Sequence, residues 1–268
     1  NNTGAIVAYN RDTKALRLFA KNLAISAQGV SGSLGLVHHK GNLVVGTHAG
    51  KLLRYAAAMN DLEGKLLGEL TLPGEDAGKP VTGLTADTAN DVLFVASTDH
   101  LYRLKLGPND WAKLIALPQI LAISYGRTFG ATGQGGLLIL QEGTAVHRIA
   151  TEALLANGPV NPEPLPVGDI SAVDLAATAC GRALVAGETP LILQDTADNK
   201  LGFDAWVEDE FDQYVTFIKT ICWPDDEPVG WVVDVQRRAG LGRFHPASSD
   251  SAGWAIQVLI LADALNAD

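Results

Sequence analysis

Gly41–Tyr55 reads GNLVVGTHAGKLLRY, an apolar run followed by a short turn of small residues and a second apolar run. The same order returns at Asp91–Leu104 (DVLFVASTDHLYRL), Gly136–Ile149 (GLLILQEGTAVHRI) and Arg182–Asp195 (RALVAGETPLILQD). Two short β-prone runs joined by a turn predict a β-hairpin. The chain is therefore expected to contain a β-hairpin that is repeated along the sequence.

The spacing of these hairpins indicates the size of the repeat. Equivalent leucines at the start of the second strand fall at Leu43, Leu93, Leu138 and Leu184, which gives steps of 50, 45 and 46. Repeats of this length are typical of propeller blades and are longer than leucine-rich, ankyrin or tetratricopeptide repeats. Helical repeats are disfavoured because the apolar runs are short, rich in β-branched residues and separated by glycine.

Each hairpin is flanked by a further apolar run on both sides, which predicts a four-stranded antiparallel meander. The predicted units span residues 30–72, 81–118, 121–168, 170–208 and 215–262, after an opening hairpin within 1–20. The last run of the third unit, 162–168, is weak strand material because of its prolines. Consecutive apolar residues in the second strands, such as Leu93-Phe94-Val95, predict sheets that are covered on both faces.

The hairpins resemble those of β-propellers with PQQ-like or WD40-like repeats, and LVVGTHAGKLLRY carries the resemblance over residues 30–235. It implies an all-β, single-domain β-propeller over 1–268 with blades of four antiparallel strands. Six blades are predicted, with five or seven as alternatives, and residues 254–261 would pair with the opening hairpin to close the ring. No His and Trp-Asp signature, Asp-box or vicinal cysteine pair is present, so the resemblance transfers no catalytic residue.

Composition narrows the classes of partner. The formal net charge of −10 argues against binding nucleic acid through its phosphates. No segment has the length and hydropathy of a membrane-spanning helix, and no signal peptide is visible, so we expect no membrane insertion and a cytoplasmic or virion-associated location. Cys180 and Cys222 lack the spacing of a zinc site or a disulfide framework and are expected to be buried thiols.

Histidines and arginines provide the candidate ligand-binding residues. His48 and His100 fall in the turn between the second and third strands, where they are either exposed turn residues or members of a binding site. Arg54, Arg103 and Arg148 occupy the third strand of three successive units. A row of guanidinium groups is suited to an anionic ligand or a glycan, and the alternative is repeat ancestry with snorkelling at a blade rim.

Asp174 and Asp234 lie inside apolar strands, where carboxylates are unusual. They are the candidate catalytic residues of an alternative in which the chain is a propeller hydrolase or lactonase with a metal in the axial channel. Structural, hydrogen-bonded carboxylates are the default interpretation of such a pair. No metal site with a full ligand set and no cofactor motif is found, so neither a metal nor a cofactor is predicted.

These observations favour a non-catalytic propeller that acts as a binding or assembly module with protein partners. A structural component of a larger complex, such as a virion, is one form of this function. The metal-dependent hydrolase and anion capture by the arginine row are kept as alternatives.

Overall fold

The computed structural model describes the backbone of residues 4–9, 16–23, 35–56, 64–126, 135–142, 145–158 and 160–165, and of the strands that follow them. Side chains are described for Ile6, Leu18–Ala20, the ranges between 35 and 165, and Leu175. The chain divides into two compact units, Asn1–Ile120 and Leu121–Asp268, and each is considered by itself.

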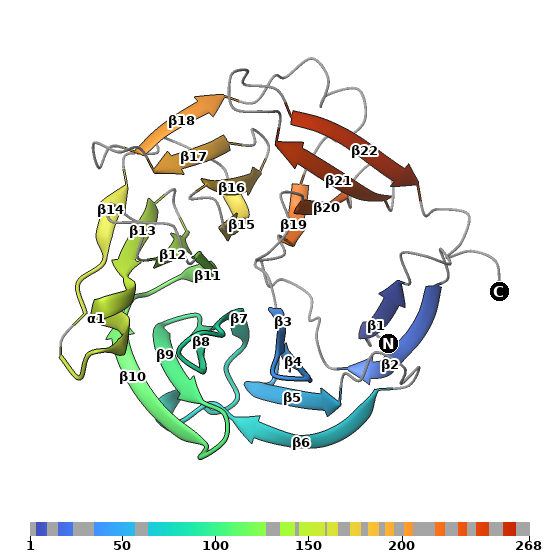
Figure 1. Cartoon of the computed structure of the whole chain (residues 1–268). Coiled ribbons are helices and arrows are strands. Elements are labelled where there is room, and N and C mark those ends of the chain that lie inside the picture. The colour runs from blue at the N-terminus through green and yellow to red at the C-terminus, as the bar shows by residue number, and fades with distance from the viewer. Residues whose placement is uncertain are drawn as a thin grey trace. The chain divides into compact units, whose positions relative to one another are not determined.

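The first unit contains a hairpin and two four-stranded sheets (Figure 1). The hairpin and first sheet are β1 (Gly4–Tyr9), β2 (Leu16–Leu23), β3 (Leu36–His39), β4 (Asn42–Gly46), β5 (Lys51–Ala56) and β6 (Lys65–Thr71). After the 3₁₀ helix η1 (Gly74–Asp76) come β7 (Val81–Asp87), β8 (Val92–Ser97), β9 (His100–Lys105) and β10 (Asp110–Ala116). Strands are adjacent in chain order and antiparallel, as expected for meanders.

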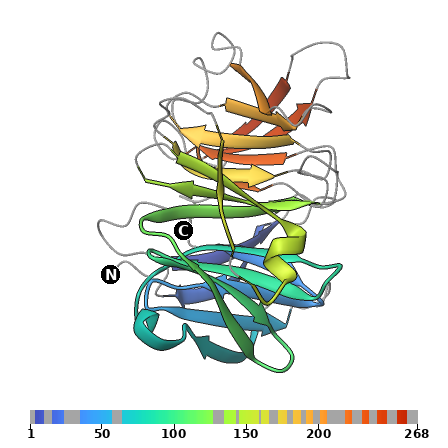
Figure 2. The same cartoon turned by 90° about the vertical axis from the view of Figure 1, so that its left-hand side faces the viewer.

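The second unit contains three four-stranded sheets in the same order. Its elements are β11 (Ile120–Gly126), β12 (Gly136–Gln141), β13 (Ala145–Ala150), α1 (Thr151–Leu155), β14 (Glu163–Leu165), β15 (Ala172–Ala177), β16 (Arg182–Gly187), β17 (Leu191–Asp195), β18 (Leu201–Ala205), β19 (Ile218–Cys222), β20 (Gly230–Asp234), β21 (Gly240–Pro246) and β22 (Trp254–Ile260). The short helix α1 directly follows β13 and is seen from the side in Figure 2.

The predicted four-stranded antiparallel pattern is confirmed, while the bounds of the units and a single domain over 1–268 stay predictions. The proline-rich run within 162–168 forms only the three-residue strand β14, because proline cannot donate to a strand ladder. Helix α1 was not predicted. β22 pairs with β21 as the fourth strand of its own sheet, and ring closure by residues 254–261 stays a prediction, as does the number of blades.

The hydrophobic core of the first unit lies on both sides of its sheets, as the consecutive apolar runs predicted. Every residue of β8 is buried. One cluster joins Val44 and Leu52 of the β3–β6 sheet to Leu84 and Leu93 of the β7–β10 sheet. A second cluster places Tyr55 and its neighbours against Ile6, Phe19 and Ala20 of the opening hairpin. The two four-stranded sheets of this unit are held together by this packing, and also by the bonds of Val81 N to Thr47 O and of His39 Nε2 to Asp91 Oδ1.

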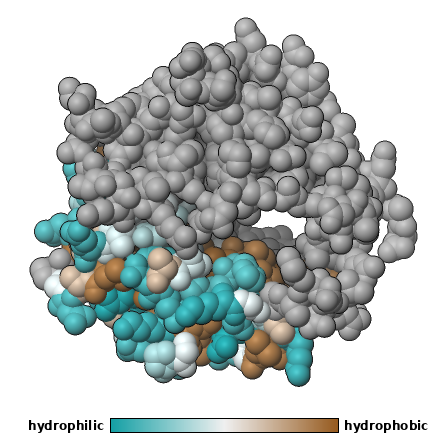
Figure 3. All heavy atoms as spheres, viewed as in Figure 1, coloured by the Kyte–Doolittle hydropathy of each residue, from teal (hydrophilic) through white to brown (hydrophobic). Residues whose placement is uncertain are grey.

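The outer strands β6 and β10 are more exposed than the strands beside them. The ladder to the neighbouring strand shifts by one residue in each, which leaves Leu67 in β6 and Leu114 in β10 without a partner in that ladder. Large exposed apolar side chains among the described residues include Leu66 and Leu67, exposed by 47% and 48%. Figure 3 shows brown apolar groups between teal polar ones on this part of the surface. No helix among the described residues is long and apolar enough to span a membrane.

Candidate functional site: a braced loop before β7

The loop of residues 74–80 is longer than its counterpart in the next sheet. Seven residues separate Pro73 from Val81, whereas one residue, Gln119, separates Pro118 from Ile120. The flanking backbone bonds are equivalent. Leu72 N donates to Gly50 O at 2.9 Å and Val81 N to Thr47 O at 3.0 Å, while Leu117 N donates to Asp99 O at 2.9 Å and Ile120 N to Thr98 O at 2.9 Å. Loop 74–80 is therefore an insertion relative to the equivalent connection between β10 and β11.

The inserted loop is compact and packs on the β4–β5 turn. Lys79 N donates to Asp76 O at 2.9 Å, which closes the loop on itself. Gly50 in the β4–β5 turn has a φ of +70°, and a Cβ atom there would lie 2.7 Å from Gly78 N and 2.7 Å from Lys79 O. Glycine at position 50 therefore allows both the left-handed turn and the close approach of the loop backbone.

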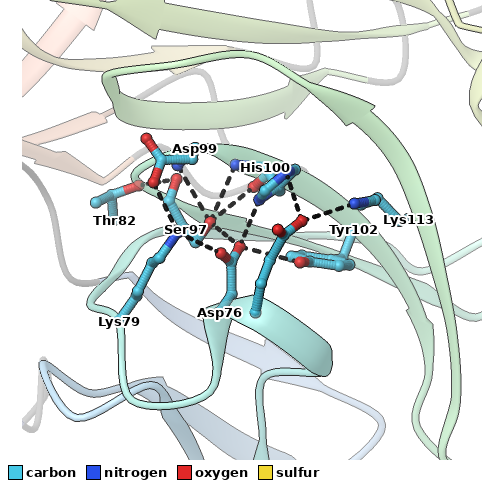
Figure 4. Close-up of polar contacts among 9 residues, drawn as sticks. Asp76, Lys79, Thr82, Ser97, Asp99, His100, Tyr102 and Lys113 are labelled. Atoms are coloured by element: carbon cyan, nitrogen blue, oxygen red, sulfur yellow. Dashed lines mark hydrogen bonds and ion pairs between the residues drawn. The ribbon is translucent and has the colours of Figure 1, made fainter.

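Asp76 is the centre of the contacts that hold this loop, and it is 0% exposed (Figure 4). Its Oδ2 atom accepts a hydrogen bond from the Ser97 hydroxyl at the end of β8. The same oxygen lies 2.9 Å from His100 Nδ1 and accepts a bond from the Tyr102 hydroxyl at 3.0 Å, both in β9. One carboxylate oxygen thus ties the inserted loop to two neighbouring strands of its own sheet.

Ion pairs surround this centre at the surface. Lys79 Nζ lies 2.9 Å from Asp76 Oδ1 and 2.8 Å from Asp99 Oδ2. Asp76 Oδ1 accepts no hydrogen bond of good geometry from the described residues. Its polar contact is the ion pair with Lys79. Glu75 Oε1 lies 3.2 Å from His100 Nε2 and 2.9 Å from Lys113 Nζ of β10. Acidic and basic side chains of the loop therefore form ion pairs with side chains of the β7–β10 sheet and its β8–β9 turn.

The contacts change the acidity of the groups involved. Burial by itself raises the pKa of Asp76, but the hydrogen bonds from Ser97, Tyr102 and His100 and the contact with Lys79 outweigh burial and lower the pKa to about 2. Burial and the bond to Asp76 raise the pKa of Tyr102. The hydrogen bond from Lys113 lowers the pKa of Glu75. Asp76 is therefore a carboxylate at neutral pH, and Tyr102 keeps its proton.

A serine, a histidine and an aspartate meet here, but their arrangement is not that of a nucleophilic triad. In a triad the histidine ring accepts the proton of the serine hydroxyl. The Ser97 hydroxyl instead donates to Asp76 and accepts from the amides of Asp99 and His100 at 3.2 and 3.0 Å. Neither ring nitrogen of His100 contacts Ser97 Oγ among these bonds, so the hydroxyl is not activated by the ring. The arrangement braces a loop.

The two predicted histidines occupy different environments. His48 lies in the β4–β5 turn and is half-buried, and its Nδ1 atom has no hydrogen-bond partner among the described residues. His100 opens β9 and is only 8% exposed. The expectation of an exposed turn residue is wrong for His100, because the inserted loop covers its ring with Glu75 and Asp76. A ligand-binding role for either histidine stays a prediction.

The predicted arginines occupy the third strands, at Arg54 in β5, Arg103 in β9 and Arg148 in β13, and all three are half-buried. Arg148 Nη2 donates to Glu163 Oε2 on β14 at 2.7 Å, which gives this guanidinium a structural partner in its own sheet. Arg54 Nε has no hydrogen-bond partner among the described residues. Binding of an anion or a glycan by these arginines stays a prediction.

Asp174 lies in β15 and Asp234 in β20, and the side chains of both are outside the described residues. Cys180 is outside them as well, as is the side chain of Cys222 in β19. Within the described ranges, no three His, Cys, Asp or Glu side chains are grouped so as to hold a metal ion. The axial metal site of the hydrolase alternative therefore stays a prediction.

Sequence reasoning missed the residues at the centre of the site, namely Asp76, Ser97, Tyr102 and Lys79. One signal for them was present. The Leu-Pro pairs at 72–73 and 117–118 end the first two units, and the connection after the first pair has six more residues than the connection after the second, among them Glu75, Asp76 and Lys79. Charged residues in a surface loop that is longer than its counterpart indicate a candidate binding loop, because binding residues concentrate on loops of a rigid scaffold.

Comparison with known proteins identifies a fold but no family. No family model and no curated protein matches the chain. Solved structures that resemble it include a functionally unknown protein from Desulfotomaculum acetoxidans, with 13% identity, 96% of this chain and 77% of that chain covered, and a TM-score of 0.63. A chain of a nidogen/laminin complex has 14% identity, coverage of 82% and 78%, and a TM-score of 0.60.

A third similar structure is the β-propeller domain of Swd1 from Myceliophteria thermophila, with 13% identity, coverage of 88% and 72%, and a TM-score of 0.54. At such identities the likeness concerns the fold alone. Together with the repeated four-stranded sheets, it confirms the predicted all-β propeller fold and the generic resemblance to propeller repeats.

Proposed function

We propose that the chain is a non-catalytic β-propeller that binds a protein partner, as a rigid module of a larger assembly, and that loop 74–80 is part of its binding surface. Propeller folds host many functions, so the fold supports binding only by analogy. One structural neighbour was solved in a nidogen/laminin complex, which is an example of this fold in a protein assembly. A place in a virion is one version of the proposal.

The braced insertion is the observation that carries the proposal. Gly74, Glu75, Ala77 and Gly78 are exposed, while Asp76 between them is fully buried and holds the loop to β8 and β9. A surface loop that is already fixed loses little conformational entropy when a partner binds. Loops on a rigid scaffold are also where binding residues concentrate. An added loop with its own internal brace is therefore well suited to recognition.

The same contacts disfavour catalysis at this place. Catalysis by a serine or histidine needs a group that is free to transfer a proton to a substrate. Asp76 Oδ2 already has three partners, and each ring nitrogen of His100 faces a carboxylate. The polar groups of the loop are thus engaged with one another, which leaves the exposed loop surface rather than a reactive group as the functional feature.

A photo-crosslinking experiment tests the proposal. A photoreactive amino acid is placed at Ala77 in the loop or, as a matched control, at Ala89 in the β7–β8 turn, which is also exposed and lies at the opposite end of β7. Both variants are added to extract from the native host and irradiated. We expect a discrete crosslinked product from position 77 and none of that mass from position 89.

The crosslink is then repeated in the Ala77 probe protein that also carries Asp76→Asn. Loss of the brace should reduce the product at least several-fold, because the loop no longer holds its binding conformation. The same products from both probe positions, or no discrete product from position 77, would show that loop 74–80 is not a recognition surface.

A further inference from the structure

His100 lies between two carboxylates that both belong to the inserted loop. Its Nδ1 atom is 2.9 Å from Asp76 Oδ2, and its Nε2 atom is 3.2 Å from Glu75 Oε1. The His100 side chain is 10% exposed, while that of Glu75 is 60% exposed, so the ring is covered by the loop and the outer carboxylate faces solvent. The histidine belongs to β9 and both acids to η1, so these contacts join the loop to the sheet.

The number of donors on the ring decides how well this geometry is satisfied. A neutral imidazole has one N–H donor, and its other nitrogen carries a lone pair, whereas the imidazolium ion has two donors. A carboxylate oxygen next to each nitrogen suits only the form with two donors. In either neutral tautomer a nitrogen lone pair faces a carboxylate, which is unfavourable.

We propose that His100 is a pH-dependent latch for loop 74–80. The doubly protonated ring holds the loop on β9 through both carboxylates, and loss of one ring proton loosens the loop. Histidine is the side chain that most often changes charge near neutral pH. The loop is therefore held more firmly when the ring carries both protons than when it has lost one of them.

Other groups around the ring set the size of the effect. Lys79 of the loop contacts Asp76 Oδ1, and Lys113 of β10 contacts Glu75 Oε1. Tyr102, next to the ring in β9, donates to Asp76, and Asp99 in the β8–β9 turn faces Lys79. The two lysines and the hydroxyl groups of Tyr102 and Ser97 keep their contacts when the ring becomes neutral. The loop is therefore expected to loosen rather than to leave the sheet.

The latch bears on recognition through the proposed function. If loop 74–80 binds a partner, binding should be stronger when the loop is held, and so at lower pH. This regulatory meaning rests on the proposed function, but the latch itself is a property of the free protein. A measurement on the free protein therefore separates failure of the latch from failure of the binding proposal.

Amide hydrogen exchange in the free protein provides that measurement. The amides of Ala77 and Lys79 donate to Gly74 O and Asp76 O within the loop. After correction for the intrinsic dependence of exchange on pH, we expect their protection to fall about tenfold from about pH 5.5 to about pH 8, since a hydrogen bond to a charged group is of this strength. Equal protection at the two pH values would overturn the proposal.

Variants separate the ring of His100 from other titrating groups. His100→Gln should remove the pH response, while His38→Gln, at an exposed histidine of β3, should keep it. A full response in His100→Gln would overturn the latch. Glu75→Gln provides a second test that does not depend on the folding of the first variant, because Glu75 is exposed. Glu75→Gln should reduce the change in amide protection between the two pH values to less than about threefold. An unchanged difference in protection would again overturn the proposal.

Discussion

Replacing Asp76 by asparagine tests the brace directly. Asparagine keeps the shape of the side chain and one acceptor oxygen, but it removes the negative charge and brings an NH₂ group close to donors. Ser97, His100 and Tyr102 all direct groups at Oδ2, and Lys79 faces Oδ1. We expect Asp76→Asn to be among the more destabilising single substitutions in this unit.

The expected loss of folding free energy in Asp76→Asn follows from the contacts of Asp76 and from its lowered pKa. The fall of the Asp76 pKa from 3.8 to about 2 corresponds to about 2 kcal/mol of folding free energy, because one pKa unit is worth about 1.4 kcal/mol. Loss of one partner from a buried charged pair destabilises proteins by about 3–5 kcal/mol, since the remaining partners stay buried. Asparagine retains one acceptor, so we expect a loss of about 3 kcal/mol.

Urea-induced unfolding followed by circular dichroism is the assay, with Asp110→Asn as the matched control. Asp110 is an exposed residue of β10, and its substitution should change stability by less than about 0.5 kcal/mol. Equal losses in the two variants, or a loss below about 1 kcal/mol for Asp76→Asn, would refute the view that Asp76 holds the loop.

The pH dependence gives an independent check on the same residue. A carboxylate whose pKa is lowered by folding stabilises the protein above its ordinary pKa, and this contribution disappears as the pH falls toward the folded value. The difference in stability between the natural protein and Asp76→Asn should therefore be full above about pH 5 and shrink between about pH 4 and about pH 2. A difference that stays constant over this acidic range would contradict the assignment.

Two further pairs of substitutions test packing by the same unfolding assay. Gly50→Ala and Gly41→Ala both place alanine at a positive φ, +70° and +72°, but only the former brings Cβ against backbone, so Gly50→Ala should lose about 1–3 kcal/mol more. Equal losses would show that the loop is not packed on the turn. Phe94→Ala, at a residue that is 0% exposed, should cost about 3–5 kcal/mol, whereas Leu66→Ala, at 47% exposure, should cost less than about 1 kcal/mol. Similar losses for the two would place Phe94 outside the core.

The strands were predictable because their signals are local. Residues 92–96 are apolar at consecutive positions, and with Ser97 they form the fully buried strand β8. Prolines shortened β14 as expected. Helix α1 was not predictable by periodicity, because its five residues span little more than one turn.

The candidate site was less predictable because it depends on which distant residues the sheet register brings together. Asp76 is 21, 24 and 26 positions from Ser97, His100 and Tyr102, and no sequence spacing identifies such partners. The alignment placed Arg148 in the correct strand, but its bond to Glu163 depends on the register of β13 and β14. Burial of His100 results from an inserted loop, so it is not a property of the repeat.

The register shifts in β6 and β10 have a consequence for how copies of the chain meet. A strand at the rim of a sheet offers free amide and carbonyl groups to any other strand, and growth along such rims leads to fibres. The extra residues Leu67 and Leu114 interrupt the regular alternation that a neighbouring strand needs. The rim strands of these two sheets are therefore poor templates for a strand of another copy of the chain.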